Sequence, residues 1–245
     1  MFRLINNQTM ILYFLRNFRF KCVLIVLTLI STTAFSQPKN NSISFPNLIA
    51  DKYGVNSFSQ ISSIQFSFNV KNQNTILKRT WIWEPKTGKV TFTGADQNGK
   101  DTSITYNRDK LNSGNALELY ADKRFINDQY WLLFPFHMVW DNNVDITNQG
   151  NKEFPISHKK GNSIIVHYKN NVGYTPNDAF VLYLGDDNMI KEWTYRPGGS
   201  KEKERSYTWA GNKKYGGITI STEHNGLGNK FKVWFTDISV VTDSK

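Results

Sequence analysis

The sequence predicts a mainly β protein with a small helical part (α+β), in which a curved antiparallel sheet, or incomplete β-barrel, wraps around a short helical segment. Three observations lead to this fold class. Apolar and polar residues alternate with a period of two in many short runs, which is typical of half-buried antiparallel strands. Turn-rich connections separate these runs, and one long stretch after the N-terminal region has helical spacing instead. No rhythm of alternating strands and helices occurs, so a parallel sheet is not expected.

Residues 1–36 are predicted to be a secretory signal peptide. A basic start without acids precedes the apolar run Val23–Ile30, and small residues follow it, which is the pattern of a signal cut here before Gln37. The basic residues are Arg3, Arg16, Arg19 and Lys21. Met10 is an alternative start, and an uncleaved N-terminal anchor is the alternative interpretation. The expected location is therefore the periplasm or the outside of a Gram-negative-type cell.

Cleavage of this signal changes the composition of the chain. It leaves 209 of the 245 residues, lowers the formal net charge from +10 to +6, and removes Cys22, the only cysteine. A chain without cysteine excludes thiol catalysis and zinc sites built on Cys. The remaining surplus of basic residues suits anionic partners.

The remainder is predicted to be a flexible leader at 37–44 and a single domain at 45–245, because no repeat or linker divides it. Phe45–Tyr53 is predicted to form a short helix that ends at Gly54. Ile64–Val70 alternates apolar with polar residues and predicts a strand. Further strands of this first group are predicted at Ile76–Glu84, Lys89–Thr93 and Ser103–Asn107.

The stretch from about 113 to 134 predicts one broken helix or two short ones, because its apolar residues lie at helical spacing. The helix is expected to end before Pro135, since a proline disfavours helical backbone in the residue ahead of it. Strands resume after Asp141. They are predicted at Ser163–Lys169, Ala179–Leu184, Met189–Tyr195, Glu204–Trp209, Gly217–Thr222 and Lys230–Val241.

Two spacings imitate ligand motifs, but both favour ordinary loops. Gly94, Gly99 and Lys100 match the start of a phosphate-binding loop, yet Asp101 follows where the motif needs Ser or Thr, so an Asn-Gly hairpin is preferred. Asp141, Asn143 and Asp145 are spaced like the start of a calcium loop, but Ile146 stands where the motif needs Gly and Lys152 stands at position twelve, so a solvated loop is preferred. The four histidines form no ligand pair. No metal site and no cofactor are predicted.

Three functions from different classes are compatible with these features. The first, preferred function is an exported, non-enzymatic protein that binds a lipid or another apolar ligand in a cavity between sheet and helix. The second is a glycan or ester hydrolase that uses acids such as Asp128, Asp141 and Glu192. The third is an envelope interaction module whose aromatic residues only fill a core. Nucleic acid is not an expected partner for two reasons. The aromatic residues lie mostly on alternating strand faces, and the predicted export signal directs the chain away from nucleic acid.

The cavity hypothesis names its lining and rim. Aromatic residues make up 14% of the chain, and those on predicted inward faces are the candidates. The predicted lining is Phe66, Phe68, Trp81, Trp83, Tyr130, Trp131, Leu133, Phe134, Trp193 and Trp209. Arg79 and Arg196 are predicted at the rim, where they would meet an anionic headgroup. The protein is expected to be a monomer, and transient contact with a membrane surface is compatible with this hypothesis.

Two stretches resemble the superfamily of periplasmic lipoprotein carriers, the LolA/LolB-like fold. One is Asn127–Phe136, which is similar to an "NDxYWLxxP" segment of uncharacterised exported relatives. The other is the succession of strands and turns from Ala179 to Ile238, which includes Tyr207–Trp209 and Gly217–Ser221. The resemblance implies an incomplete, strongly curved barrel around a short helical lid, with a concave face that takes acyl chains.

Overall fold

The computed structural model describes residues 44–142, 144–169 and 176–243. The predicted signal peptide, the alternative start sites and nearly all of the predicted leader fall on residues 1–43, outside the described residues. Within the described residues, no helix is both long and apolar enough to cross a membrane.

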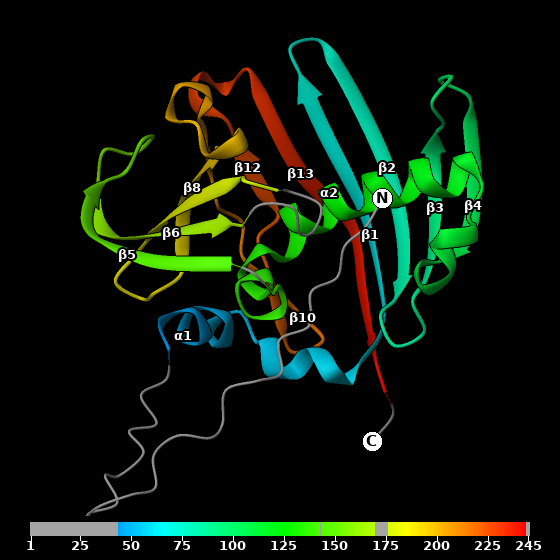
Figure 1. The fold of residues 1–245 in the computed structure, drawn as a ribbon, viewed down its shortest axis with the longest axis horizontal. Coiled ribbons are helices and arrows are strands. Elements are labelled where there is room, and N and C mark those ends of the chain that lie inside the picture. Colours follow the sequence, from blue (N-terminus) through cyan, green and yellow to red (C-terminus); the bar gives the residue numbers. More distant parts are fainter. Residues whose placement is uncertain (1–43, 143, 170–175, 244–245) are drawn as a thin grey trace, which may run out of the picture. The chain divides into compact units, whose positions relative to one another are not determined.

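Two large antiparallel sheets and one small sheet make up the β structure (Figure 1). The six-stranded sheet has the order β12-β13-β1-β2-β3-β4. Its strands are β1 (Ile61–Asn72), β2 (Thr75–Glu84), β3 (Lys89–Ala95), β4 (Asp101–Asn107), β12 (Glu223–Asn225) and β13 (Phe231–Thr242). The five-stranded sheet has the order β5-β6-β7-β8-β9. Its strands are β5 (Val144–Glu153), β6 (Lys160–Tyr168), β7 (Ala179–Leu184), β8 (Ile190–Arg196) and β9 (Arg205–Thr208).

The two large sheets meet along one edge only. Isolated backbone bridges join Tyr207 to Gly226 and Ala210 to Glu223, beside the small sheet of β10 (Lys213–Tyr215) and β11 (Ile218–Ile220). At the other ends of the strand order, β4 and β5 do not pair with each other in the described residues. The strands therefore form a curved, unclosed β structure with a helical part, and the predicted fold class is confirmed.

Helices fill the space that the sheets leave open. α1 (Phe45–Lys52) is short, and α2 (Ala116–Trp140) is the long helix. Short 3₁₀ turns complete the structure at Val55–Gln60, Arg108–Ser113, Pro197–Gly199, Lys201–Lys203 and Leu227–Asn229, the last of which is η5. α2 begins with a capping box, in which Asn115 Oδ1 accepts from the N–H of Glu118 at 3.0 Å and Glu118 Oε2 accepts from the N–H of Asn115 at 3.0 Å. This exchange satisfies donors that a helix otherwise leaves unpaired.

α2 changes character along its length. Its first turns bury one face only, whereas every residue from Leu132 to Met138 is buried. The backbone departs from helical angles at Leu133 (φ −127°, ψ 23°), two residues before Pro135. A proline inside a helix removes one hydrogen bond and clashes with the preceding turn, so the helix bends here. The predicted break is confirmed, but the predicted end before Pro135 is wrong, because helical structure resumes and continues to Trp140.

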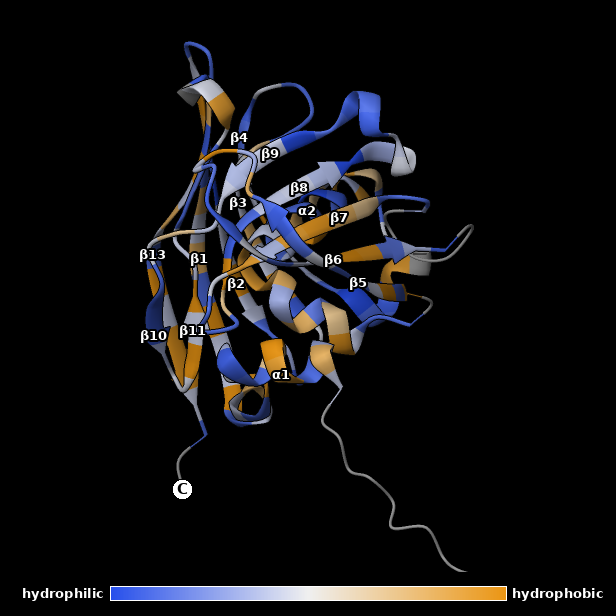
Figure 2. Ribbon diagram, turned by 90° about the vertical axis from the view of Figure 1, so that its left-hand side faces the viewer, coloured by the Kyte–Doolittle hydropathy of each residue, from blue (hydrophilic) through white to orange (hydrophobic). Residues whose placement is uncertain are grey.

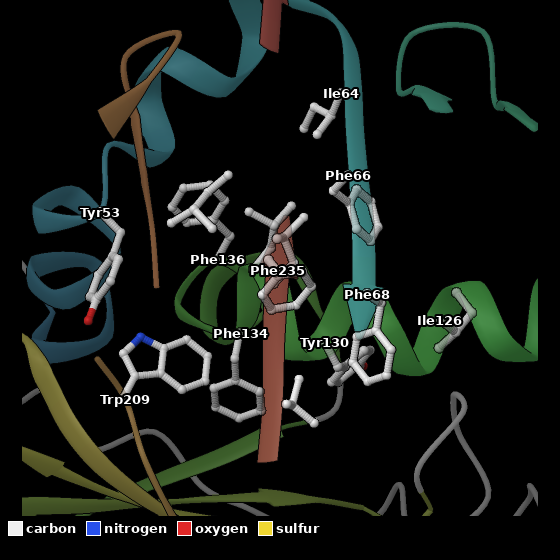
Figure 3. Close-up of a cluster of buried hydrophobic side chains, with 14 of the residues drawn as sticks. Tyr53, Ile64, Phe66, Phe68, Ile126, Tyr130, Phe134, Phe136, Trp209 and Phe235 are labelled. Atoms are coloured by element: carbon white, nitrogen blue, oxygen red, sulfur yellow. The ribbon is translucent and has the colours of Figure 1, made fainter. Parts of the chain in front are cut away.

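The second half of α2 packs between the sheets and forms the centre of the core. The Phe134 ring lies 4.6 Å from that of Phe180 on β7 and 5.2 Å from that of Trp193 on β8, between ring centroids. Earlier on the helix, Phe125 lies 5.4 Å from Trp81 on β2. Figure 3 shows side chains from α2, β1 and β13 and Tyr53 at the end of α1 in one cluster. In Figure 2 the apolar colour lies on strands such as β7, and the connecting turns are hydrophilic.

Most predicted elements have observed counterparts within a few residues. The Asn98-Gly99 hairpin is confirmed between β3 and β4, where Asp96 Oδ1 accepts from the N–H groups of Asn98 and Lys100. The predicted loop after Asp141 is corrected from Val144 onward, since β5 begins there. β5 was missed because it is an edge strand with almost entirely exposed side chains, so it has no apolar alternation. The strands β10 and β12 were missed because each has three residues, too few to show an alternation of apolar and polar side chains.

Candidate ligand-binding site

A cavity of about 780 Å³ lies between the two large sheets, beside the first half of α2. Ligand-binding cavities in proteins typically measure about 300–1,000 Å³ and have mostly apolar walls with a few polar groups. The residues that line this cavity are Phe68, Val70, Arg79, Leu111, Leu119, Asp122, Lys123, Ile126, Asn127, Tyr130, Trp131, Asp178, Phe180, Trp193, Tyr195, Arg205, Tyr207 and Phe231. The space between sheet and helix is therefore packed at one end and hollow at the other.

One wall of the cavity is a stripe along α2. Leu119, Lys123, Ile126 and Tyr130 recur three or four residues apart and so lie on the same face of the helix. Sequence reasoning placed only the end of this stripe in the site. The spacing itself was visible in the sequence and could have identified the whole stripe.

The other walls come from strands of both sheets. Phe68 and Val70 lie two apart on β1 and therefore point to the same face. From the second sheet, Trp193 stacks on Phe180 with ring centroids 5.3 Å apart. Trp131 on α2 meets Trp193 edge to face at 4.8 Å, so helix and sheet share an aromatic corner of the cavity. Such edge-to-face pairs are favoured over face-to-face sandwiches.

The structure divides the predicted lining into two groups. Phe68, Tyr130, Trp131 and Trp193 line the cavity, and so does the predicted rim residue Arg79. The other predicted lining residues are buried in the core beside it, with exposed fractions of 7% or less. They are Phe66, Trp81, Trp83, Leu133, Phe134 and Trp209.

Arg79 is held by a buried carboxylate behind the cavity wall. Its Nε and Nη2 donate to the two oxygens of Asp128 at 2.7 and 2.6 Å. Asp128, which is fully buried on α2, also accepts from Trp81 Nε1 at 2.9 Å. The pKa of Arg79 is affected most by burial, which lowers it, but the hydrogen bonds and charge of Asp128 outweigh burial and raise it. Arg79 therefore presents a neutralised ion pair to the cavity.

Arg196, the second predicted rim residue, lies outside the cavity lining. Its Nε donates to Glu204 at 3.0 Å, so its charge is also paired. Lys123 and Arg205 are the other two cations of the lining. In the described residues, no carboxylate forms an ion pair with either of them.

The two acids of the lining already have partners. Asp178 accepts from Tyr195 Oη at 2.8 Å and from the N–H of Gly198 at 2.7 Å. Burial, followed by this bond to Asp178, raises the pKa of Tyr195 to about 12. Asp122 accepts from Arg108 Nε at 2.8 Å and from Tyr106 Oη at 3.2 Å. The wall thus combines apolar rings with two cations outside any ion pair and one carboxylate, Asp178, that accepts from neutral donors.

The three acids of the hydrolase alternative lie in separate hydrogen-bond networks. Asp128 binds Arg79, as described. Asp141 accepts from Tyr130 at 2.6 Å and from Tyr168 at 2.8 Å. Glu192 is 3% exposed and accepts from the N–H groups of Ile156 and Ser157. In the described part of the chain, no two of these acids share a hydrogen-bond partner.

The environment of Asp141 includes a stacked histidine. His137 Nδ1 lies 3.0 Å from Asp141 Oδ1, and its ring stacks on Tyr130 at 3.9 Å. Burial raises the pKa of Asp141, but the hydrogen bonds from His137 and the two tyrosines prevail and lower it. Across residues 44–142, 144–169 and 176–243, no group of three or more His, Cys, Asp or Glu side chains is arranged to hold a metal ion.

Comparison with known proteins finds weak structural similarity and no match in sequence. No protein-family model and no curated protein sequence matches the chain. A DUF1329 family protein from Desulfovibrio piger is similar in structure, with a TM-score of 0.41 and 10% identity over 80% of this chain and 93% of that one. The Mycobacterium tuberculosis lipoprotein LppX gives a TM-score of 0.31 and 8% identity over 81% and 97%. MucB gives 0.28 and 13% over 80% and 60%.

All three similarities are weak. By its own features, the chain is an unclosed antiparallel β structure around a bent helix, with a cavity at one end. Membership in the lipoprotein-carrier superfamily stays a prediction.

Proposed function

We propose that the protein is an exported, non-enzymatic binding protein whose cavity takes the apolar part of a lipid, a lipoprotein acyl chain or another hydrophobic ligand. The observation that supports this proposal is the cavity of about 780 Å³ with its aromatic and aliphatic walls. A ligand that places its apolar part against these walls removes apolar surface from water, which contributes roughly 25 cal/mol for each Å² buried.

The charges of the lining favour an amphiphile with an anionic end. Arg79 and Asp122 belong to ion pairs, and Asp178 accepts from neutral donors. Lys123 and Arg205 form no ion pair with a described carboxylate, so two cations stand against the one carboxylate of Asp178 and the lining carries an excess of one positive charge. A carboxylate or phosphate at these two residues would restore the balance of charge in the cavity. The proposed ligand therefore carries its apolar part among the rings and its anionic end beside Lys123 and Arg205.

The first test is whether the cavity takes up an apolar probe. Val70→Trp and Leu119→Trp together narrow the cavity from a strand and from the helix, at positions open enough to accept a larger ring. The matched control is Ile82→Trp with Val241→Trp, at exposed positions outside the lining. We expect the cavity variant to bind a fluorescent fatty acid about tenfold more weakly than wild type, and the control to bind it normally.

Native mass spectrometry and lipid extraction of the purified protein supply a second readout. We expect an apolar molecule to co-purify with wild type and with the control, and less of it with the cavity variant. Equal probe binding by all three proteins, with nothing apolar in the extract, would refute the proposal.

The anionic end is tested by comparing a fatty acid with the corresponding alcohol. The double variant Lys123→Gln with Arg205→Gln should bind the fatty acid about fivefold more weakly, because a partly exposed charge pair contributes at most about 1 kcal/mol. Its affinity for the alcohol should not change. Arg196→Gln is the control outside the lining. A loss of equal size for acid and alcohol would contradict the assignment of these two cations.

A further inference from the structure

Two hairpins of the six-stranded sheet end side by side beyond the cavity. The β1–β2 turn and the connection from η5 to β13 are joined by a hydrogen bond from the N–H of Gln73 to the carbonyl of Lys230 at 3.1 Å. Next to it, Asn72 pairs with Phe231 in the strand register. We call residues 71–78 and 227–230 the tip surface, which lies at the upper edge in Figure 1. All eight residues from 71 to 78 are exposed.

The tip surface is unusually apolar for such an exposed segment. Ile76 is 62% exposed, Leu77 50% and Leu227 66%, which makes three of the six strongly exposed large hydrophobics of the described residues. Neighbouring residues in a strand point to opposite faces, so Ile76 and Leu77 make both faces of the hairpin apolar at its end. A flat protein partner covers one face of a hairpin. An interface that surrounds the end, as a bilayer surface does, covers both.

The charge of the tip surface has one sign. Its only charged residues are Lys71, Lys78 and Lys230, and it contains no acid. Lys78 pairs with Asp237 at 2.9 Å, whereas neither Lys71 nor Lys230 has an ion pair among the described residues. Basic residues close to an anionic membrane contribute about 1 kcal/mol each, and apolar residues beside them enter the headgroup region.

The tip surface continues directly into the cavity wall. Val70 and Phe231 line the cavity and are the chain neighbours of Lys71 and Lys230. Leu77 lies opposite Val70 in the register of β1 and β2, so both point to the same face of the sheet. An apolar path thus leads from the exposed end of the hairpin to the cavity.

We propose that the tip surface docks on an anionic lipid bilayer, with Ile76, Leu77 and Leu227 in the headgroup region and Lys71 and Lys230 on anionic lipids. The docking itself needs no cavity ligand. Its purpose rests on the proposed function, since it would place the cavity wall against a source or an acceptor of lipid.

Vesicle sedimentation tests this docking with the full chain, purified after export from the producing cell. Vesicles of phosphatidylglycerol mixed with phosphatidylcholine are compared with vesicles of phosphatidylcholine alone. Ile76→Ser, Leu77→Ser and Leu227→Ser are combined, and the matched control combines Ile82→Ser with Val241→Ser, which are exposed elsewhere. We expect at least about a tenfold loss of binding to the anionic vesicles for the tip variant and none for the control. Any contribution of the N-terminal segment is common to all variants.

Charge is tested separately. Lys71→Gln with Lys230→Gln should weaken binding to anionic vesicles by about tenfold, whereas the exposed pair Lys159→Gln with Lys160→Gln should not change it. Insertion is tested with Leu77→Trp against the background of the seven native tryptophans. Brominated lipid should quench a larger fraction of the total tryptophan fluorescence of this variant than of wild type, whereas Ile82→Trp should be quenched like wild type.

Three results would overturn the inference. Tip variants that sediment like wild type would show that the surface does not dock. Equal binding to neutral and anionic vesicles would remove the role of the lysines. A tip variant that loses self-association in light scattering, with vesicle binding unchanged, would identify a second copy of the chain as the partner. Binding of the fluorescent fatty acid is measured on the same variants. A loss of vesicle binding with normal fatty-acid binding then concerns the docking surface, and a loss of fatty-acid binding concerns the cavity.

Discussion

The ion pair between Arg79 and Asp128 offers a quantitative test of how the helix is attached to the first sheet. Asp128 is fully buried and lies outside the cavity lining, and its oxygens accept from Arg79 twice, from Trp81 and from Asn127 Nδ2 at 3.0 Å. Asp128→Asn keeps the volume but removes the charge. It leaves the guanidinium of Arg79, with 14% of its side chain exposed, without a counter-ion.

The expected cost of Asp128→Asn is about 3 kcal/mol in the free energy of unfolding. Removing one partner of a buried ion pair costs about 3–5 kcal/mol, and the limited exposure of Arg79 favours the lower end. Since a domain is stabilised by about 5–15 kcal/mol, this is a large fraction of the total. Adding Arg79→Met removes the unpaired charge, and the Asn side chain still accepts from Trp81. We expect this double variant to recover at least about 1 kcal/mol.

Urea unfolding followed by tryptophan fluorescence measures both values. The control is Asp237→Asn, because Lys78 and Asp237 form an ion pair one residue along β2 with side chains 55% and 50% exposed. An exposed pair contributes about 0–1 kcal/mol, so the control should cost less than that. The reasoning is refuted if Asp128→Asn costs no more than the control, or if the double variant is less stable than the single one.

Three further predictions concern stability. Burial lowers the pKa of His224 from 6.5 to about 3. Between these two pH values the unfolded chain binds a proton at this histidine and the folded chain does not. The free energy of unfolding therefore decreases as the pH is lowered below 6.5, by up to about 1.4 kcal/mol per pH unit. Chemical unfolding from pH 7 to 5 should show a shallower slope for His224→Gln and an unchanged slope for the exposed His158→Gln. Asn115→Ala should cost about 1 kcal/mol in the same assay at pH 7, and no loss would contradict the capping box. Gly54→Ala should destabilise the chain more than Gly99→Ala. Both glycines have positive φ, but only at Gly54 would a Cβ lie 2.3 Å from a backbone oxygen. Equal midpoints of thermal unfolding for the two variants would refute this prediction.

Regular alternation and short apolar runs made strands of both large sheets predictable. Ile64, Phe66 and Phe68 are buried as their spacing required, and β7 begins and ends where its apolar run does. The helix past Pro135 was not predictable from local preference alone. The residues after the bend, Phe136 and Met138, are buried in the hydrophobic core, where Phe136 packs edge to face on Phe58, and this packing outweighs the cost of the proline.

The cavity could be predicted only in part, because inward residues look the same whether they fill a core or line a hollow. Phe66 and Phe68 are two residues apart on one face of β1, yet only Phe68 lines the cavity. Phe66 is fully buried and packs on Phe235 of β13, whereas Phe68 borders the cavity beneath the guanidinium of Arg79, 4.8 Å from its ring centroid. The partners of charged residues were equally hidden, since Arg79 and Asp128 are 49 positions apart in the chain.

The bend in α2 has a consequence for how such a protein diversifies. The segment after the bend is enclosed by aromatic packing, whereas the stripe before it faces the cavity. Mutations at Leu119, Ile126 or Val70 alter the hollow end and leave the packed end intact. Under the proposed function, selection for a new ligand would act on these positions with little loss of stability, and related proteins would keep the scaffold while the ligand changes.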